Sequence, residues 1–236
     1  TPTSRDVAAR RYNIMKLHGT DAELWDLEKL KKTIPHLNYH NARFPILGAA
    51  VQKRAGNARH DAVVWGYARA ADQLGVDIIQ NCEVKGIKRN GDSVEGIETT
   101  KGFIKTKKIG VVAAGHSSVI ASMVDIKLPL ESKPLQALVS EPVKPIIDTV
   151  VMSNAVHAYV SQSDKGELVI GAGTDAYVSY TQRGSHDVVE GTLKAILELY
   201  PIFSRMKMLR QWGGIVDICP DASPIISKTH IKGLYF

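Results

Sequence analysis

The stretch IGVVAAG, residues 109–115, followed by HSSVIASMV, residues 116–124, decides the fold class. The first part is apolar over the length of a strand, and the second opens with the small residues of a helix start. A strand that is apolar on both faces is typical of a parallel sheet covered on both sides. We therefore expect an α/β protein in which this strand belongs to a nucleotide-binding layer.

The sequence before this stretch predicts helices first and strands later. The run GTDAELWDLEKLKKTIP predicts a helix with Thr20 and Glu23 as its capping box. The run ARHDAVVWGYARAADQLG predicts a second helix that ends at Gly75. From residue 76 to 108 β-branched runs prevail, with a hairpin turn at NGD, residues 90–92. Two tryptophans, Trp65 in the second helix and Trp212, are expected in the core.

The sequence after residue 129 has a different character. Four prolines between residues 129 and 153 indicate irregularly linked strands, and HAYVSQSDKGELVIGAG predicts a hairpin that turns at residues 164–166. SHDVVEGTLKAILELYP predicts an amphipathic helix, and THIKGLYF a last apolar strand. We expect a substrate domain inserted into the nucleotide-binding domain. Residues 1–57 are expected to form a helical segment and the first strand of the substrate domain, and residues 58–125 a part of the nucleotide-binding domain. Residues 126–213 would form the substrate domain, and residues 214–236 would return to the nucleotide-binding domain.

Composition excludes several classes of protein. A hydrophobic share of 44% and a charged share of 23% are ordinary for a globular chain and exclude a disordered one. No apolar run approaches the ~20 residues of a membrane span. The net charge of +6 is spread over short lysine runs without interleaved aromatics, so we expect no nucleic-acid partner. Cys82 and Cys219 form no metal-ligand cluster and fit a reduced, cytoplasmic setting.

Two further patterns carry little chemistry. GAGTDA, residues 171–176, has the spacing of a dinucleotide fingerprint, but the following YVSYTQRGS does not start a helix, and we interpret the glycines as a turn. No Ser-His-Asp, HExxH or paired-carboxylate arrangement is visible, and no residue stands out as a general base. The chain starts at Thr1 and ends inside an apolar run, so we expect an internal piece of a longer protein.

His60 is the one histidine in a suggestive position. It falls at the N-terminal edge of a predicted helix, beside Arg59. The helix dipole and the neighbouring cation both disfavour an imidazolium, so a neutral imidazole is expected. A neutral ring nitrogen is what covalent attachment to an electrophilic cofactor methyl group requires. On these grounds alone, a residue that merely flanks a helix start remains the favoured interpretation.

Three blocks add a family resemblance that covers essentially the whole chain. GNARHDAVVWGYARAADQLGVDIIQNCEVKGI, PLQALVSEPVKPIIDTVVMSNAVHAYVSQSDKGELVIGAG and RQWGGIVDICPDASPIIS resemble the beta subunits of heterotetrameric sarcosine oxidases. These belong to the D-amino-acid oxidase-like flavoprotein superfamily. The resemblance implies an FAD-binding Rossmann-like domain, present here in part, with an inserted mixed or antiparallel substrate domain. A Gly-rich FAD fingerprint would precede Thr1, and a flavin-contacting segment would follow Phe236.

The resemblance also implies an activity, cofactors and partners. Sarcosine would be oxidised at non-covalent FAD, and FMN attached covalently through His60 would be shared with the alpha subunit. Electrons would reduce oxygen to hydrogen peroxide, and the one-carbon unit would pass to tetrahydrofolate on the alpha subunit. Gamma and delta subunits would complete the heterotetramer.

Several further positions carry over from the family. Val84 would hold the adenine side of FAD through its backbone, and Ala114 and Gly115 would form a second nucleotide-contacting loop, where small residues let the backbone approach the cofactor. His157, Tyr159 and Arg210 would line the flavin or substrate side, and Arg210 could hold a substrate carboxylate or a flavin phosphate. For His157 and Tyr159, burial on a strand face is an equally good interpretation.

Two alternatives remain open. One is a related amine oxidoreductase of the same superfamily, such as a dimethylglycine dehydrogenase or a glycine or D-amino-acid oxidase, because fold alone does not fix the substrate. The other is a non-catalytic subunit that only holds a flavoprotein partner.

Overall fold

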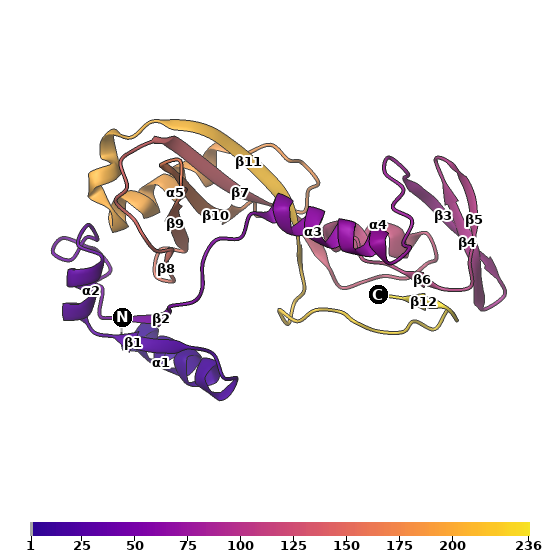
Figure 1. Ribbon diagram of the computed structural model, residues 1–236, viewed down its shortest axis with the longest axis horizontal. Coiled ribbons are helices and arrows are strands. Elements are labelled where there is room, and N and C mark those ends of the chain that lie inside the picture. Colours follow the sequence, from indigo (N-terminus) through magenta and orange to yellow (C-terminus); the bar gives the residue numbers. More distant parts are fainter. Residues whose placement is uncertain (1) are drawn as a thin grey trace. The chain divides into compact units, whose positions relative to one another are not determined.

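The computed structural model describes residues 2–236 and divides the chain into two compact units (Figure 1). The first unit comprises residues up to Asn57, residues 135–175 and residues 182–214. The second unit comprises residues 58–134, 176–181 and 215–236. Each unit therefore combines segments that are far apart in the sequence.

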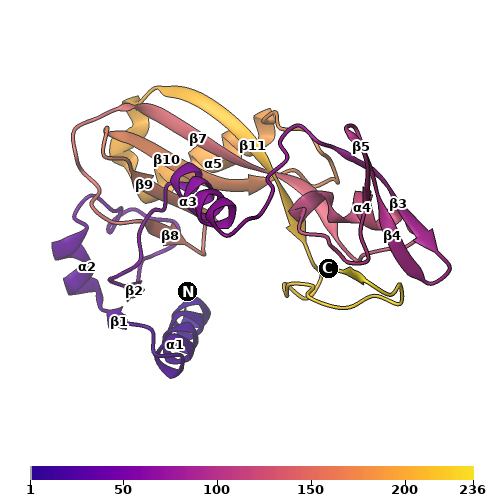
Figure 2. The ribbon, with the colours of Figure 1, turned by 45° about the vertical axis from the view of Figure 1, so that its right-hand side comes forward.

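A five-stranded sheet with the order β11-β7-β10-β9-β8 dominates the first unit (Figure 2). The pairings of β7 with β10, β10 with β9 and β9 with β8 are antiparallel. The hairpin predicted at residues 164–166 is confirmed as the connection of β9 to β10, with Gly166 at φ +100°. The strands are β7 (Glu131–Pro142), β8 (Val151–Ser153), β9 (Ala158–Gln162), β10 (Glu167–Thr174) and β11 (Met208–Ile218).

Helix α5 (His186–Leu199) covers one face of this sheet and confirms the predicted amphipathic helix. Its apolar side continues into Tyr200 and the short helix η2 (Pro201–Arg205). Burial of these side chains against the sheet supplies the main apolar stabilisation of the unit. The buried core contains Leu138, Val160, Leu168, Ile170, Ile196, Leu199, Tyr200 and Phe203.

The N-terminal elements correct one prediction. They are α1 (Pro2–Leu17), β1 (Ala22–Trp25), α2 (Leu27–Thr33) and β2 (Ala49–Gln52). The predicted capping box at Thr20 and Glu23 is wrong, because Asp26 caps α2 and its Oδ1 accepts from the backbone N–H of Lys29 at 2.8 Å. Glu23 lies in β1, which pairs antiparallel with β2. Pairing between distant segments thus overrides the local helical pattern.

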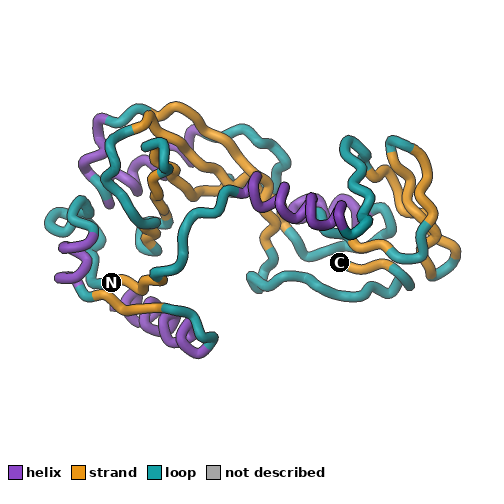
Figure 3. The backbone as a smooth tube through the Cα atoms, in the orientation of Figure 1, coloured by secondary structure: helices purple, strands orange, loops and turns teal. Residues whose placement is uncertain are grey.

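The second unit contains two small sheets. Strands β3 (Val84–Asn90), β4 (Ser93–Thr99) and β5 (Gly102–Lys105) form an antiparallel meander, and Gly91 at φ +57° confirms the predicted hairpin turn. Strand β6 (Ile109–Gly110) pairs in parallel with β12 (Leu234–Tyr235), as expected for the nucleotide-binding layer. The chain between β11 and β12 runs mostly as loop (Figure 3).

Around β6 lie the helices and the core of this unit. Helix α3 (His60–Gln73) precedes the meander and ends before Gly75, which has a φ of +85°. After β6 come the short helices η1 (Ala114–His116) and α4 (Ser117–Ser122). The buried core contains Ile87, Val94, Val111, Val124, Ile231 and Leu234.

Three burial predictions are wrong for the residues that the structure describes. Val112 was expected in a strand covered on both faces, yet 97% of its surface is exposed, whereas Val111 is buried. Trp65 and Trp212 were expected in the core and are 63% and 40% exposed. Helix α3, which carries Trp65, has no buried residue. Within residues 2–236 no helix is long and apolar enough to cross a membrane.

Candidate functional site

The face of the five-stranded sheet opposite α5 carries exposed apolar side chains, and we call it the open face. Strand alternation places Tyr159 of β9 on this face, because its neighbours Ala158 and Val160 are buried in the core. Tyr159 lies directly opposite Gly171 of β10 and Met152 of β8. Met152 is 67% exposed. The open face is therefore accessible around Tyr159 in the first unit.

Arg210 lies on the same open face. The Nε2 of Gln211 donates to the Oε1 of Gln136 at 2.8 Å, and Gln136 is buried on the α5 side of the sheet. Alternation from Gln211 assigns the exposed Arg210 and Trp212 to the open face, and because Met208 packs against the core on the α5 side, the alternation of β11 is broken between Met208 and Gln211. Strand β11 is three strand intervals from β9, which corresponds to roughly 14 Å at ~4.8 Å per interval. The predicted residues Tyr159 and Arg210 thus share a face without being neighbours.

His157 occupies a different place from these two residues. It lies in the turn between β8 and β9, is exposed, and has a φ of +51°. A non-glycine residue in the left-handed region leaves the strand alternation, so its side chain is not part of the row formed by β9. The structure therefore places His157 at the end of the sheet.

A buried polar cluster beneath the sheet was missed by sequence reasoning. Gln136 Nε2 donates to Asp175 Oδ2 at 3.1 Å, and Ser185 Oγ donates to Asp175 Oδ1 at 2.6 Å. The Oε1 of Gln136 also accepts from the backbone N–H of Ser185 at 2.8 Å. These bonds connect β7, the end of β10 and the start of α5. A glutamine within the alternating strand PLQALVS is the sequence signal that could have indicated it.

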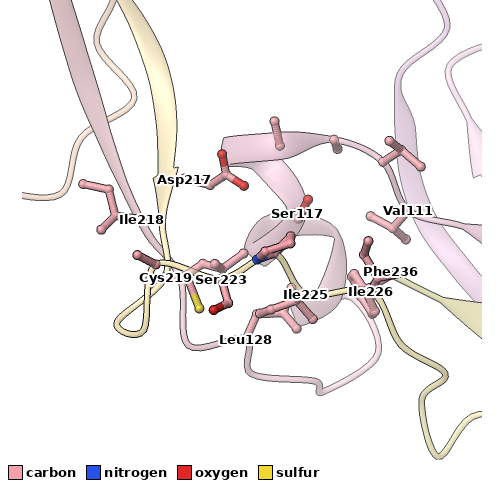
Figure 4. A pocket seen from close by; sticks show the side chains of 16 residues that line it. Val111, Ser117, Leu128, Asp217, Ile218, Cys219, Ser223, Ile225, Ile226 and Phe236 are labelled. Atoms are coloured by element: carbon pink, nitrogen blue, oxygen red, sulfur yellow. The ribbon is translucent and has the colours of Figure 1, made fainter. Parts of the chain in front are cut away.

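The second unit contains a cavity of about 810 Å³ beside α4 (Figure 4). Side chains from α4, from the loop after it and from the segment after β11 surround it, among them Ser117, Leu128 and Ile225. None of its described lining residues is a lysine or arginine, so the cavity suits an uncharged ring system better than a phosphate. The lining consists of residues 111–114, 117, 128, 130, 217–219, 222–226 and 236.

Of the predicted nucleotide-contacting residues, Ala114 lines this cavity, whereas the next residue, Gly115, is not among the lining residues. Ala114 has a φ of +44°, and Gly115 is buried with its carbonyl oxygen accepting from Ser132 Oγ. Val84 is half-buried at the start of β3 and pairs with Thr99. Val84 is not among the residues that line the cavity.

The cavity wall includes a thiol that sequence reasoning left without a role. Cys219 donates to the carboxylate of Asp221, and this hydrogen bond, with burial second, raises the pKa of the thiol. Asp221 Oδ1 also accepts from the backbone N–H of Ser223 at 3.0 Å. Cys219 and Cys82 are both free, and no group of three or more potential metal ligands occurs in the described part of the chain. The wall thus presents a protonated thiol and a fixed turn.

His60 is the first residue of α3 and is exposed. Arg59 Nη2 lies 3.4 Å from Asp61 Oδ2, and the backbone N–H of Ala62 donates to Asp61 Oδ1 at 2.8 Å. That backbone hydrogen bond, followed by Arg59, lowers the pKa of Asp61. The imidazole therefore has a carboxylate beside it as well as the expected cation. Val63, Val64, Trp65 and Tyr67 on the same helix are exposed, so His60 borders an apolar surface.

Comparison with known proteins gives a family and a set of close relatives. A family model described as FAD dependent oxidoreductase matches residues 1–236. A sarcosine oxidase subunit beta of Rhodobacter capsulatus is 55% identical over 93% of the chain and 53% of the relative's length. The subunit of that name in Rhizobium meliloti is 54% identical over 98% of the chain and 56% of its own length. The chain thus spans about half the length of these relatives.

Solved structures confirm the predicted D-amino-acid oxidase-like fold class. The L-proline dehydrogenase of P. horikoshii superimposes with a TM-score of 0.91 at 23% identity, over 100% of this chain and 63% of that one. At this identity the likeness supports the fold alone.

Proposed function

Because the chain belongs to the FAD-dependent oxidoreductase family, we propose that it is part of the beta subunit of a sarcosine oxidase, which oxidatively demethylates sarcosine to glycine. The identity of 52–55% to sarcosine oxidase beta subunits carries the proposal. D-amino acid dehydrogenases of the same superfamily are only 21–26% identical, which makes the related-oxidoreductase alternative weaker.

The cavity of the second unit fits the ring end of FAD. Its volume and mostly apolar walls, without lysine or arginine among the described lining residues, support a flat ring system there. Bound FAD would supply the redox chemistry by accepting a hydride from the carbon next to the amine nitrogen. The backbone around Ala114 and Gly115 would approach the ring end, and the backbone of Val84 the adenine end.

On the substrate side we propose Tyr159 and Arg210 of the open face, with His157 at its end. The Tyr159 hydroxyl forms no hydrogen bond with any residue between 2 and 236, which leaves it available to a ligand. Arg210 is exposed, and its guanidinium suits a substrate carboxylate or a flavin phosphate. The substrate amine must lose its proton before oxidation, and neither residue is a convincing base for that step.

We further propose that His60 carries FMN covalently at a surface shared with the alpha subunit. The support is its exposed imidazole beside the exposed residues Val63, Val64 and Trp65, since such apolar patches mark interaction sites. Gamma and delta subunits would complete a cytoplasmic heterotetramer. Oxygen would be reduced to hydrogen peroxide there, and the one-carbon unit would pass to tetrahydrofolate on the alpha subunit.

The activity is tested with the full-length protein produced together with its partner subunits. Hydrogen peroxide formation is measured with sarcosine, dimethylglycine, glycine and D-alanine. We expect the highest kcat/KM with sarcosine. A higher value for another amine would assign the protein to the related oxidoreductases, and no oxidation of any of them would support the non-catalytic alternative.

The role of His60 is tested by mass spectrometry of the tryptic peptide His60–Arg69, which should carry an FMN adduct on His60. Acid precipitation of the wild-type complex should leave one flavin bound to protein and release the FAD. His60→Ala should release both flavins, whereas His40→Ala, which changes another exposed histidine, should not. Flavin that stays bound to the acid-precipitated His60→Ala variant would contradict the assignment of His60 as the FMN attachment site.

A further inference from the structure

We propose that Gly171 is a positioning residue for the amine site: its missing side chain makes room for the Tyr159 ring and so fixes where the Tyr159 hydroxyl meets the substrate. This inference rests on the proposed function, because it takes the open face as the substrate side. No motif marks Gly171 for such a role, and the sequence pattern alone suggested a turn.

The far end of the Tyr159 ring occupies the space that a side chain of Gly171 would take. The two residues are directly opposite each other in β9 and β10. A Cβ built on Gly171 would lie far closer than 3.0 Å to the Cε1, Cζ and Oη atoms of Tyr159. Gly171 has no positive φ, so the backbone itself does not require glycine. The missing side chain therefore serves the ring of Tyr159.

The two glycines of the GAG sequence, Gly171 and Gly173, lie on opposite faces of the sheet. Gly171 pairs with Ala137 and Gly173 with Gln136, so that a register shift separates them. A Cβ on Gly173 would lie 2.6 Å from Val188 Cγ1 on α5, which is the core side. An irregularity that inserts one residue reverses the alternation of a strand. Gly173 thus provides a control with the same chemistry on the other face.

A side chain at position 171 would act on Tyr159 before it acted on the fold. The atoms that clash are at the far end of the Tyr159 side chain, which can swing about its own torsions. The ring would have to move by roughly 1 Å or more to reach an ordinary contact distance of about 3.5 Å. A displacement of about 1 Å in a group that orients a substrate can lower the rate about 100-fold.

The experiment is a double-mutant cycle in the full-length enzyme with its partner subunits. The four proteins are wild type, Gly171→Ala, Tyr159→Ala and the double variant, and kcat and KM are measured with sarcosine. We expect Gly171→Ala to lower kcat/KM about 10- to 100-fold in the wild type. In the Tyr159→Ala background it should change kcat/KM less than about twofold, because no ring remains to be displaced. Gly173→Ala should lower the Tm and leave kcat/KM within about threefold.

Several outcomes would overturn the proposal. One is that Gly171→Ala lowers kcat/KM by the same factor with and without the Tyr159 ring. Another is that Gly171→Ala leaves the kcat/KM of the otherwise wild-type enzyme unchanged. If Gly171→Ala does not fold, the double variant must fold, because its clash is removed; failure of both contradicts the proposal. If the wild type prefers another amine, the substrate class fails, and the same cycle on that amine decides the role of Gly171. If no amine is oxidised, both proposals fail.

Discussion

The side chain of Ile215 lies directly over Gly115, so that a Cβ built on Gly115 would come within 2.5 Å of Ile215 Cγ2. Gly115 is buried, and Ser132 Oγ donates to its carbonyl oxygen. The preceding residue, Ala114, lines the cavity. The contact with Ile215 therefore packs the end of β11 against the residue that follows Ala114 in the cavity wall.

Gly115→Ala should destabilise the protein because the new methyl group has no space beneath Ile215. Overpacking of this kind lowers the free energy of unfolding by about 1–3 kcal/mol. The matched control is Gly110→Ala in β6, because a Cβ there would meet nothing within 4 Å and the φ is not positive. Urea denaturation of both variants measures the difference. Equal stabilities would contradict the packing argument.

The role of Gly115 illustrates what the sequence can and cannot predict. The motif VVAAGHSS predicted that Ala114 and Gly115 contact the nucleotide, and of these two Ala114 lines the cavity. The expected reason for the glycine, the approach of a cofactor, stays a prediction, and the structure adds a second reason, the contact with Ile215. Ile215 follows one hundred residues later in the sequence, and a contact between residues so far apart cannot be predicted from local periodicity.

Tyr200→Phe should leave the protein as stable as before or make it more stable. Tyr200 is fully buried against Phe203, and its hydroxyl has no hydrogen-bond partner among the residues that the structure describes. Burial also raises the pKa of this hydroxyl. Because an unsatisfied buried polar group costs about 1–3 kcal/mol, its removal should raise the free energy of unfolding by up to about that amount.

The control for Tyr200 is Tyr39→Phe. The Tyr39 hydroxyl donates to the carbonyl oxygen of Ile34 at 2.8 Å, so its removal should lower the free energy of unfolding by about 0.5–1.5 kcal/mol. The two variants lose the same atom and should shift the Tm in opposite directions. A loss of stability in Tyr200→Phe as large as that in Tyr39→Phe would show that the buried hydroxyl is satisfied.

Glu23 should make the stability of the first unit depend on pH below about 4.5. The hydrogen bond from Lys53 Nζ, then those from Trp25 Nε1 and Lys29 Nζ, lower its pKa from 4.5 to about 2. A carboxyl whose folded pKa lies below its unfolded value stabilises the protein above the unfolded pKa. This contribution is lost as the pH falls from about 4.5 towards about 2.

Glu23→Gln tests this pH dependence. The free energy of unfolding of the wild type should exceed that of Glu23→Gln at pH 6, and the difference should shrink as the pH falls from 4.5 to 2. Added salt should also reduce the difference at pH 6, because the ion pairs are exposed. Glu95→Gln, which changes an exposed carboxylate of β4 with no ion pair within residues 2–236, serves as control. A difference that stays constant across this range would contradict the assignment.

The sequence was most informative where structure is local and least where strands from distant segments meet. Gly75 was predicted correctly as a helix stop, and Gly91 and Gly166 as parts of hairpin turns, because such features depend only on neighbouring residues. The contact between Tyr159 and Gly171 depends on the register of β9 against β10, which the spacing of residues within GELVIGAG does not reveal. A glycine inside an otherwise apolar strand was the available sign of a close approach.

Tyr159 and Arg210 should contribute independently to catalysis, in contrast to Tyr159 and Gly171. They lie on one face of the sheet, but on strands separated by β10 and β7, which corresponds to roughly 14 Å. If Tyr159 meets the sarcosine, an Arg210 guanidinium that holds a flavin phosphate shares no partner with it. Residues more than about 7–10 Å apart without shared partners show additive effects within about 0.5 kcal/mol.

The double variant Tyr159→Phe/Arg210→Gln measures this independence. We expect the fold-changes in kcat/KM for sarcosine of the two single variants to multiply in the double variant within about a factor of two. Arg205→Gln, which removes an exposed guanidinium from η2, controls for the loss of charge and should leave kcat/KM unchanged. If Arg210 holds a phosphate, its variant should release flavin during gel filtration with little change in the KM for sarcosine. If kcat/KM falls no further in the double variant than in Tyr159→Phe, both side chains act on the same group, and the predicted independence is wrong.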